Sequence, residues 1–175
     1  MEIRGPAGAA GEEVNGNSQE PVLVLGIGNY LLGDEGVGVH AIHALEQEAL
    51  PPHVHILDGG TGGFHLLSYL QDNPQVILID ATMDGRPPGT VRALKPRFAS
   101  DFPRALSAHD IGLRDLIETT ILVGKLPSID LITISVDEIQ ELGTDLSPAV
   151  LASIPEVLRH VRSLLAPHFS PAECA

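Results

Sequence analysis

The chain has 175 residues, a length typical of one domain, and its 10 basic and 23 acidic residues give a net charge of −13 at pH 7. Nucleic-acid binding depends on neutralising phosphates, so this charge argues against nucleic acid, and equally against an anionic membrane surface, as a partner. The longest apolar runs are strand-sized and no basic and apolar signal segment opens the sequence, so neither membrane insertion nor export is expected.

We divide the chain into three segments. Residues 1–20 are rich in Gly, Ala, Glu and Asn, so we expect a disordered N-terminal extension. Residues 21–165 carry the patterns of a single α/β domain, and residues 166–175 form a C-terminal tail. The one cysteine, Cys174, excludes an intramolecular disulfide and a cysteine-rich metal site, and it favours a reducing, cytoplasmic location.

The first element is an apolar run, residues 22–25, which predicts a strand buried on both faces. It leads into a glycine-rich loop over residues 26–38 that carries two adjacent acids, Asp34 and Glu35. A dinucleotide-binding fingerprint would need a third glycine where Leu31 stands, and two carboxylates would repel a phosphate. We therefore interpret the loop as presenting a carboxylate to a cation, with nucleotide binding as the weaker alternative.

Helical and strand patterns alternate through the rest of the domain. In chain order, we expect a helix over 37–50, a strand over 54–57, a glycine-rich loop over 58–63, a helix over 64–73, a strand over 76–79 closed by Asp80, a strand over 90–94, a loop over 95–108, a helix from 107 to 122, a strand over 129–136, and a helix from 147 to 165 kinked at Pro155. This order predicts an α/β three-layer sandwich with helices on both faces. Its sheet has about five strands and is mainly parallel, with one antiparallel edge strand.

Acidic residues follow the first three predicted strands. The carboxyl ends of parallel strands share one edge of the sheet, where α/β proteins bind ligands, so Glu35, Asp58 and Asp80 should gather there. Their charges repel one another, and no Lys or Arg occurs between residues 21 and 85. A divalent cation would neutralise them. For Asp80 the alternative is that the carboxylate caps nearby backbone N–H groups.

A histidine opens one of the predicted helices. In the first helical turn the dipole keeps the ring of His109 neutral and able to bind a metal, although an ordinary cap-region histidine is the alternative. Ser107 and Asp110 resemble a capping box, and no nucleophile elbow supports a Ser-His-Asp triad. We interpret His40 and His43 as helix-surface residues.

Two carboxylates and one imidazole suit a metal ion that keeps open coordination positions for water or substrate. This set of residues indicates metal-assisted hydrolysis or metal binding alone.

Three blocks of sequence carry a family resemblance. They are Gly26-Ile27-Gly28-Asn29 through Asp34-Glu35-Gly36-Val37-Gly38, then Asp58-Gly59-Gly60-Thr61-Gly62-Gly63, then Ser107-Ala108-His109-Asp110-Ile111-Gly112-Leu113. Together they resemble the hydrogenase maturation endopeptidases, over roughly residues 21–165. The resemblance implies an endopeptidase that removes the C-terminal extension of the [NiFe] hydrogenase large-subunit precursor after nickel insertion.

The resemblance also assigns roles to residues. Glu35, Asp80 and His109 become metal contacts and catalytic residues, and the segment Asp58, Gly59, Gly60 and Thr61 becomes a substrate-binding or shaping element. The metal implied is nickel carried by the precursor, with cadmium or zinc as substitutes in vitro. The alternative from another class is a non-proteolytic module that binds or checks nickel during hydrogenase assembly.

Overall fold

The computed structural model describes residues 20–102, 113–124, 126–137 and 142–168. The strands are β1 Val22–Gly26, β2 Val54–Asp58, β3 Gln75–Thr82, β4 Val91–Leu94 and β5 Ser128–Ser135. The α-helices are α1 Val37–Leu45, α2 Leu67–Asp72, α3 Leu113–Val123, α4 Pro148–Leu151 and α5 Ile154–Leu165. Short 3-10 turns cover η1 Gly33–Gly36, η2 Phe64–Leu66, η3 Ala99–Asp101 and η4 Ala166–His168.

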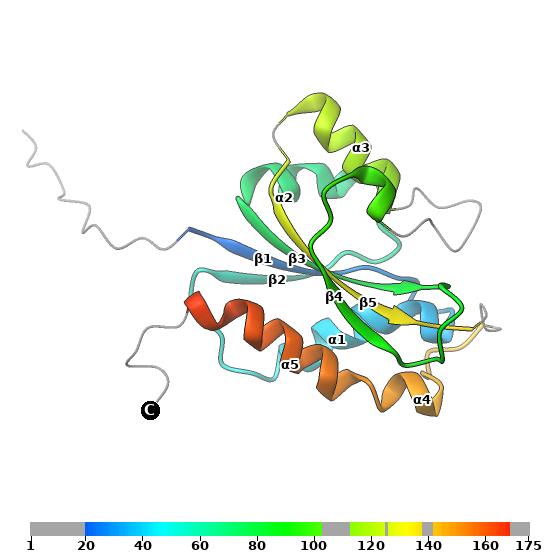
Figure 1. Ribbon diagram of the computed structural model, residues 1–175. Helices are drawn as coiled ribbons and strands as arrows, with labels where there is room; N and C mark the ends of the chain where they lie inside the picture. The colour runs from blue at the N-terminus through cyan, green and yellow to red at the C-terminus, as the bar shows by residue number, and fades with distance from the viewer. Residues whose placement is uncertain (1–19, 103–112, 125, 138–141, 169–175) are drawn as a thin grey trace, which may run out of the picture.

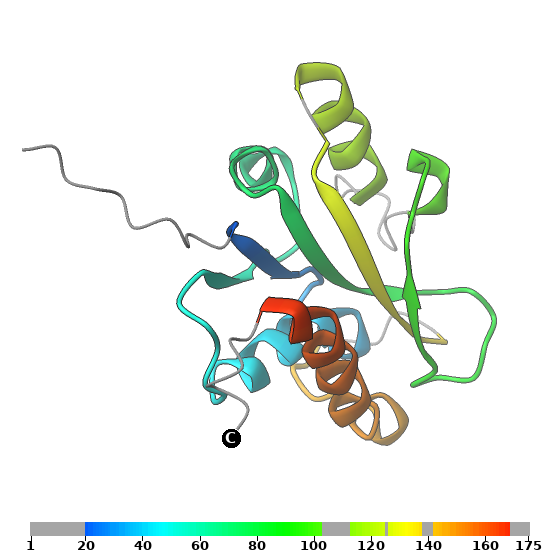
Figure 2. The same ribbon diagram turned by 60° about the vertical axis from the view of Figure 1, so that its left-hand side comes forward.

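The five strands form one sheet in the order β2-β1-β3-β5-β4. Four strands run parallel, and β4 pairs antiparallel with β5 at one edge. Figures 1 and 2 show α2 and α3 on one face of the sheet and α1, α4 and α5 on the other. The predicted three-layer architecture with one antiparallel edge strand is therefore confirmed.

Each central strand is buried on both faces because alternate side chains enter different cores. In β1, Val22 and Val24 join the cluster under α1 and α5, whereas Leu23 and Leu25 join the cluster under α2 and α3. A strand with two buried faces reads as a continuous apolar run, which is why residues 22–25 show no alternation. This packing fixes the carboxyl ends of β1 and β3 side by side at one rim of the sheet.

Three predicted boundaries were wrong. The third strand continues to Thr82, so Asp80 lies within β3 and pairs with Thr133, because β5 extends equally far. The first helix ends at Leu45 rather than at residue 50. The last helix is two helices separated at Ser153, and Pro155 lies in the first turn of α5, where its missing N–H costs no hydrogen bond. Pro155 therefore starts a helix and does not kink one.

Several sequence-based predictions concern residues outside the described ranges. These are the N-terminal extension up to residue 19, the capping box and histidine at positions 107–110, and Cys174. Within the described ranges, no helix combines the length and apolarity needed to cross a bilayer.

Candidate active site at the carboxyl edge of the sheet

The first glycine-rich loop is held in place by close backbone packing. Gly28 has a φ of +146°, and a Cβ there would lie 1.9 Å from the carbonyl oxygen of Glu35. Gly38, near the start of α1, packs so tightly against the sheet that a Cβ would lie 2.5 Å from the carbonyl oxygen of Ile79. Only glycine fits these two positions. Their effect is to set η1, which carries Glu35, directly against the end of β1 and beside β3.

The two adjacent acids of this loop have different environments, although both are buried. A carboxylate oxygen of Asp34 accepts a hydrogen bond of 2.6 Å from the backbone N–H of Ser147, the residue that precedes α4. Asp34 thus ties the loop to a segment more than a hundred residues later. Glu35, the predicted metal contact, is 8% exposed and interacts electrostatically with Asp80.

The carboxyl group of Asp80 has a strongly perturbed pKa. Burial is the main cause, and the negative charge of Glu35 adds to it; together they outweigh the hydrogen bond from the backbone of Ala81 and raise the pKa to about 8. Both effects disfavour the charged form of the carboxyl group. At neutral pH the group therefore binds a proton, unless a cation takes the place of that proton.

Five Lys and Arg side chains of the described ranges form ion pairs with acids other than Glu35 and Asp80. They engage Asp84, Asp130, Glu156 and Glu48. The sequence had already indicated that no Lys or Arg stands between residues 21 and 85. The carboxyl groups of Glu35 and Asp80 interact at the edge of the sheet, and carboxylate oxygens are suitable donors for a divalent cation.

The third predicted ligand, His109, lies outside the described residues. Among the residues described, no group of three or more His, Cys, Asp and Glu side chains could hold a metal ion. The described part of the site therefore supplies two carboxylates, and the assignment of His109 stays a prediction. The chain re-enters the described ranges at Leu113, four residues later, where the Leu113 side chain packs in the same core cluster as Ile27 of the first loop.

The second glycine-rich loop is joined to the first by backbone hydrogen bonds. Gly59 donates its backbone N–H to the carbonyl of Gly26 at 2.9 Å, and Gly28 donates to the carbonyl of Gly60 at 2.8 Å. Asp58 is exposed, and its carboxylate accepts the N–H of Gly60 at 2.8 Å and lies 3.7 Å from a ring nitrogen of His43. These contacts agree with a shaping role. The predicted contact of residues 58–61 with substrate stays a prediction.

One set of contacts around the first loop could not be found from sequence patterns. The ring of Tyr30 stacks on His40 with 4.7 Å between centroids, and His40 shares a 2.9 Å hydrogen bond with the carbonyl oxygen of Thr144. Burial is the main cause that lowers the pKa of His40, so this ring is neutral at pH 7. Its contacts make His40 a structural link rather than a solvated surface residue.

The amino-acid sequence is similar to a family of known proteins. A family model described as hydrogenase maturation protease matches residues 39–163, a range that includes Asp80 and position 109 but begins after Glu35. Among curated proteins, the chain is 40% identical over 152 residues to the hydrogenase expression/formation protein HupD of Rhodobacter capsulatus, covering 82% of this chain and 72% of that protein. It is 36% identical over 147 residues to the hydrogenase 2 maturation protease of Escherichia coli K12, covering 82% and 90%.

The fold is likewise similar to that of a solved structure. The structure of the hydrogenase maturating endopeptidase HybD from Escherichia coli superposes with a TM-score of 0.76 at 35% sequence identity, over 85% of this chain and 93% of that chain.

Proposed function

The chain belongs to the hydrogenase maturation protease family, and from this premise we propose that it removes the C-terminal extension of the [NiFe] hydrogenase large-subunit precursor after nickel insertion. In this proposal, Glu35, Asp80 and His109 recognise the nickel that the precursor already holds. The nickel is thus part of the substrate, and the endopeptidase needs no permanent metal of its own.

The observation that carries this proposal is the pairing of Glu35 with Asp80. A carboxyl group whose pKa is about 8 beside a second carboxylate is poised to exchange its proton for a cation. Precursor without nickel brings no such cation, so its docking leaves the proton on Asp80. Precursor with nickel displaces that proton, which gives the enzyme a physical means of distinguishing the two forms.

The same side chains place the ion for hydrolysis. With two carboxylates and the imidazole of His109 on one side, the nickel keeps its precursor ligands on the other and lies next to the peptide bond to be cut. The ion then polarises the scissile carbonyl or activates the attacking water. Water adds its oxygen to the carbonyl carbon and the C–N bond of the peptide breaks. One proton of the water passes to the leaving amine and the other passes to the solvent.

Cleavage of purified precursor tests the proposal. The full chain is mixed with nickel-loaded and with nickel-free large-subunit precursor, and the mass of the large subunit is followed. We expect shortening only of the nickel-loaded form, and at least a hundredfold slower cutting by Glu35→Gln, Asp80→Asn and His109→Ala, which is about the effect of removing one group that acts in the transition state. Asp84→Asn is the control, since it removes one acid that has its own hydrogen-bond and arginine partners.

Full activity in all three site variants would refute the assignment of the residues. Tight binding of nickel-loaded precursor without any shortening would instead favour the non-proteolytic nickel-checking module.

We also propose that processing takes place in the cytoplasm, because a chain with one cysteine has no disulfide to form in an oxidising compartment. Cell fractionation followed by the cleavage assay checks this location.

A further inference from the structure

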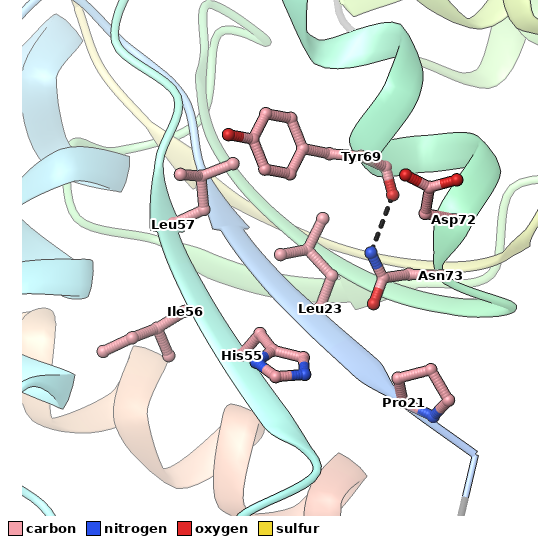
Figure 3. A pocket seen from close by; sticks show the side chains of 8 residues that line it. All are labelled: Pro21, Leu23, His55, Ile56, Leu57, Tyr69, Asp72 and Asn73. Atoms are coloured by element: carbon pink, nitrogen blue, oxygen red, sulfur yellow. Dashed lines mark hydrogen bonds between the residues drawn. The ribbon is translucent and has the colours of Figure 1, made fainter.

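Strand β2 forms one edge of the sheet, and a cavity of about 420 Å³ lies between it and α2. Figure 3 shows His55 and Leu57 on the β2 side of this cavity, Leu23 of β1 at its floor, and Tyr69 and Asn73 on the helix side. Asn73 is fixed there because its side-chain amide donates to the carbonyl of Tyr69 at 2.9 Å. The cavity is a groove with an edge strand on one side and a helix on the other.

The hydrogen bonds of β2 show which of its backbone groups face outward. Val22 donates to the carbonyl of His53 at 3.0 Å, and Gly59 donates to the carbonyl of Gly26 at 2.9 Å. In a parallel ladder, every second residue turns both its N–H and its C=O toward the neighbouring strand. The odd-numbered residues of β2 therefore bond to β1, and the even-numbered residues face the open edge.

Two residues present a full donor and acceptor set at that edge. Ile56 and Asp58 each direct an N–H and a C=O outward, whereas the N–H of Val54 already bonds to the carbonyl of Pro51 at 2.9 Å. The side chain of Ile56 packs against the core on the opposite face of the sheet. It is therefore the backbone of Ile56 that lines the groove.

The other edge of the sheet is protected in the way edge strands usually are. Strand β4 carries Arg92 and is followed by Lys95, and their charged groups lie 3.6 Å from Asp84 and 2.8 Å from Asp130. Lysine, arginine and proline on an edge strand discourage further strand pairing. The segment of β2, Val-His-Ile-Leu-Asp, contains no Lys, Arg or Pro, and its one acid, Asp58, stands at its end, so its edge remains able to accept another strand.

We propose that β2 and its groove bind the C-terminal extension of the precursor as an added β-strand, an inference that rests on the proposed function. The extension pairs its backbone with Ile56 and Asp58. Every second side chain of the extension then points into the groove between Leu57 and Tyr69. Strand addition of this kind obtains affinity from main-chain hydrogen bonds and specificity from alternate side-chain pockets.

The position of the groove connects it with the site of cleavage. The carboxyl end of β2 passes into Gly59 and Gly60, which hydrogen-bond to Gly26 and Gly28, and Gly28 packs against the backbone of Glu35. A peptide paired along β2 is therefore led toward the loop that carries Glu35, one member of the carboxylate pair. The floor of Leu23 and Leu57 and the ring of Tyr69, which is 44% exposed, favour an apolar side chain in the pocket.

Amide hydrogen exchange of the full chain tests the proposal directly. The probe is a synthetic peptide with the sequence of the extension removed from the cognate precursor. We expect added peptide to slow exchange of the Ile56 and Asp58 amides at least tenfold. The His55 and Leu57 amides, which already bond to β1, should change less than twofold. Unchanged exchange at Ile56 and Asp58 with saturating peptide would overturn the proposal.

A pair of modified peptides separates strand pairing from side-chain contact. N-methylation of alternate peptide residues removes the donors that face β2 in one version and the donors that face solvent in the other. The first version should bind at least tenfold more weakly than the second, and equal affinities would contradict the pairing.

Cleavage kinetics with groove variants provide a second readout. Tyr69→Ala should raise KM for nickel-loaded precursor by about tenfold with kcat within twofold, since truncating an aromatic contact weakens binding by about that factor. Leu122→Ala, on the exposed side of α3, is the control and should match wild type. An unchanged KM for Tyr69→Ala would count against the groove.

These results also separate the two proposals. Slowed exchange at Ile56 and Asp58 does not need cutting, so it can support strand addition even if no precursor is shortened. Cutting without slowed exchange would leave the proposed function standing and overturn strand addition alone. If these amides are protected without peptide and light scattering gives a dimer, the occupant is a second copy of the chain, and the proposal is wrong.

Discussion

Replacing Asp80 by asparagine should stabilise the protein at neutral pH while abolishing cleavage. The pKa of this carboxyl group is about 8 in the folded protein, against an ordinary value of 3.8. The folded state therefore holds the proton more tightly than the unfolded state, and its stability falls as pH rises from about 4 to about 8. Each pH unit in that window costs at most about 1.4 kcal/mol, so the cost at pH 7 is at most about 4 kcal/mol.

Urea denaturation followed by circular dichroism at pH 5, 6, 7 and 8 measures this effect. A chelator is added so that no bound cation stabilises the charged carboxylate. The advantage of Asp80→Asn over wild type should grow by about 1.4 kcal/mol per pH unit between pH 5 and pH 7. A variant that is no more stable than wild type at pH 7, or a difference that does not change with pH, would show that folding does not raise the pKa of Asp80.

Asp84→Asn is the matched control with the opposite sign. Desolvation acts to raise the pKa of Asp84, but hydrogen bonds from Ser135 and Arg86 and the charges of Arg86 and Arg92 together hold it below its ordinary value. The stability that this carboxylate contributes is present at neutral pH and is lost as pH falls through its lowered pKa. Asp84→Asn should therefore be less stable than wild type at pH 7, with a smaller difference in acid.

Three further predictions concern the first glycine-rich loop and the titration of Asp80. Asp34→Ala should lower the free energy of unfolding by about 1.5–3 kcal/mol in urea titrations, because the N–H of Ser147 loses a charged acceptor, whereas a loss under 0.5 kcal/mol would show that this bond contributes little. Gly28→Ala should destabilise by more than about 2 kcal/mol and slow cleavage, since a Cβ would meet the backbone of Glu35; near-wild-type stability and activity would contradict the tight packing. The kcat/KM for nickel-loaded precursor should rise with pH up to about 8, as the free enzyme loses the Asp80 proton, and a profile that is flat from pH 6 to pH 9 would rule out this titration.

The layers of the fold and the mainly parallel sheet could be predicted because they depend on composition averaged over whole elements. Apolar runs such as residues 22–25 and 76–79 can be buried on both faces only inside a mainly parallel sheet. Alternation with helical patterns then fixes the three-layer architecture and the edge that collects the acids. Boundaries were less predictable, because the end of β3 depends on how far β5 runs beside it.

Finer details of the site depend on contacts between distant parts of the chain. Asp34 and Glu35 are neighbours with similar chemistry, and only the N–H of Ser147 shows that Asp34 has a structural bond. The contact of His40 with the carbonyl of Thr144 likewise joins residues more than a hundred positions apart. Helical periodicity also runs through Ser153 without interruption, so nothing in the pattern separates α4 from α5. Local patterns carry no information about such contacts.

The most direct test of the shared cation is anomalous diffraction at the nickel edge from crystals of the full chain grown or soaked with Ni²⁺. We expect one strong peak about 2.0–2.4 Å from carboxylate oxygens of both Glu35 and Asp80 and from a ring nitrogen of His109. A nickel peak bound by other residues would contradict the proposed cation site. The absence of a peak at Glu35 and Asp80 in crystals saturated with nickel would contradict it as well.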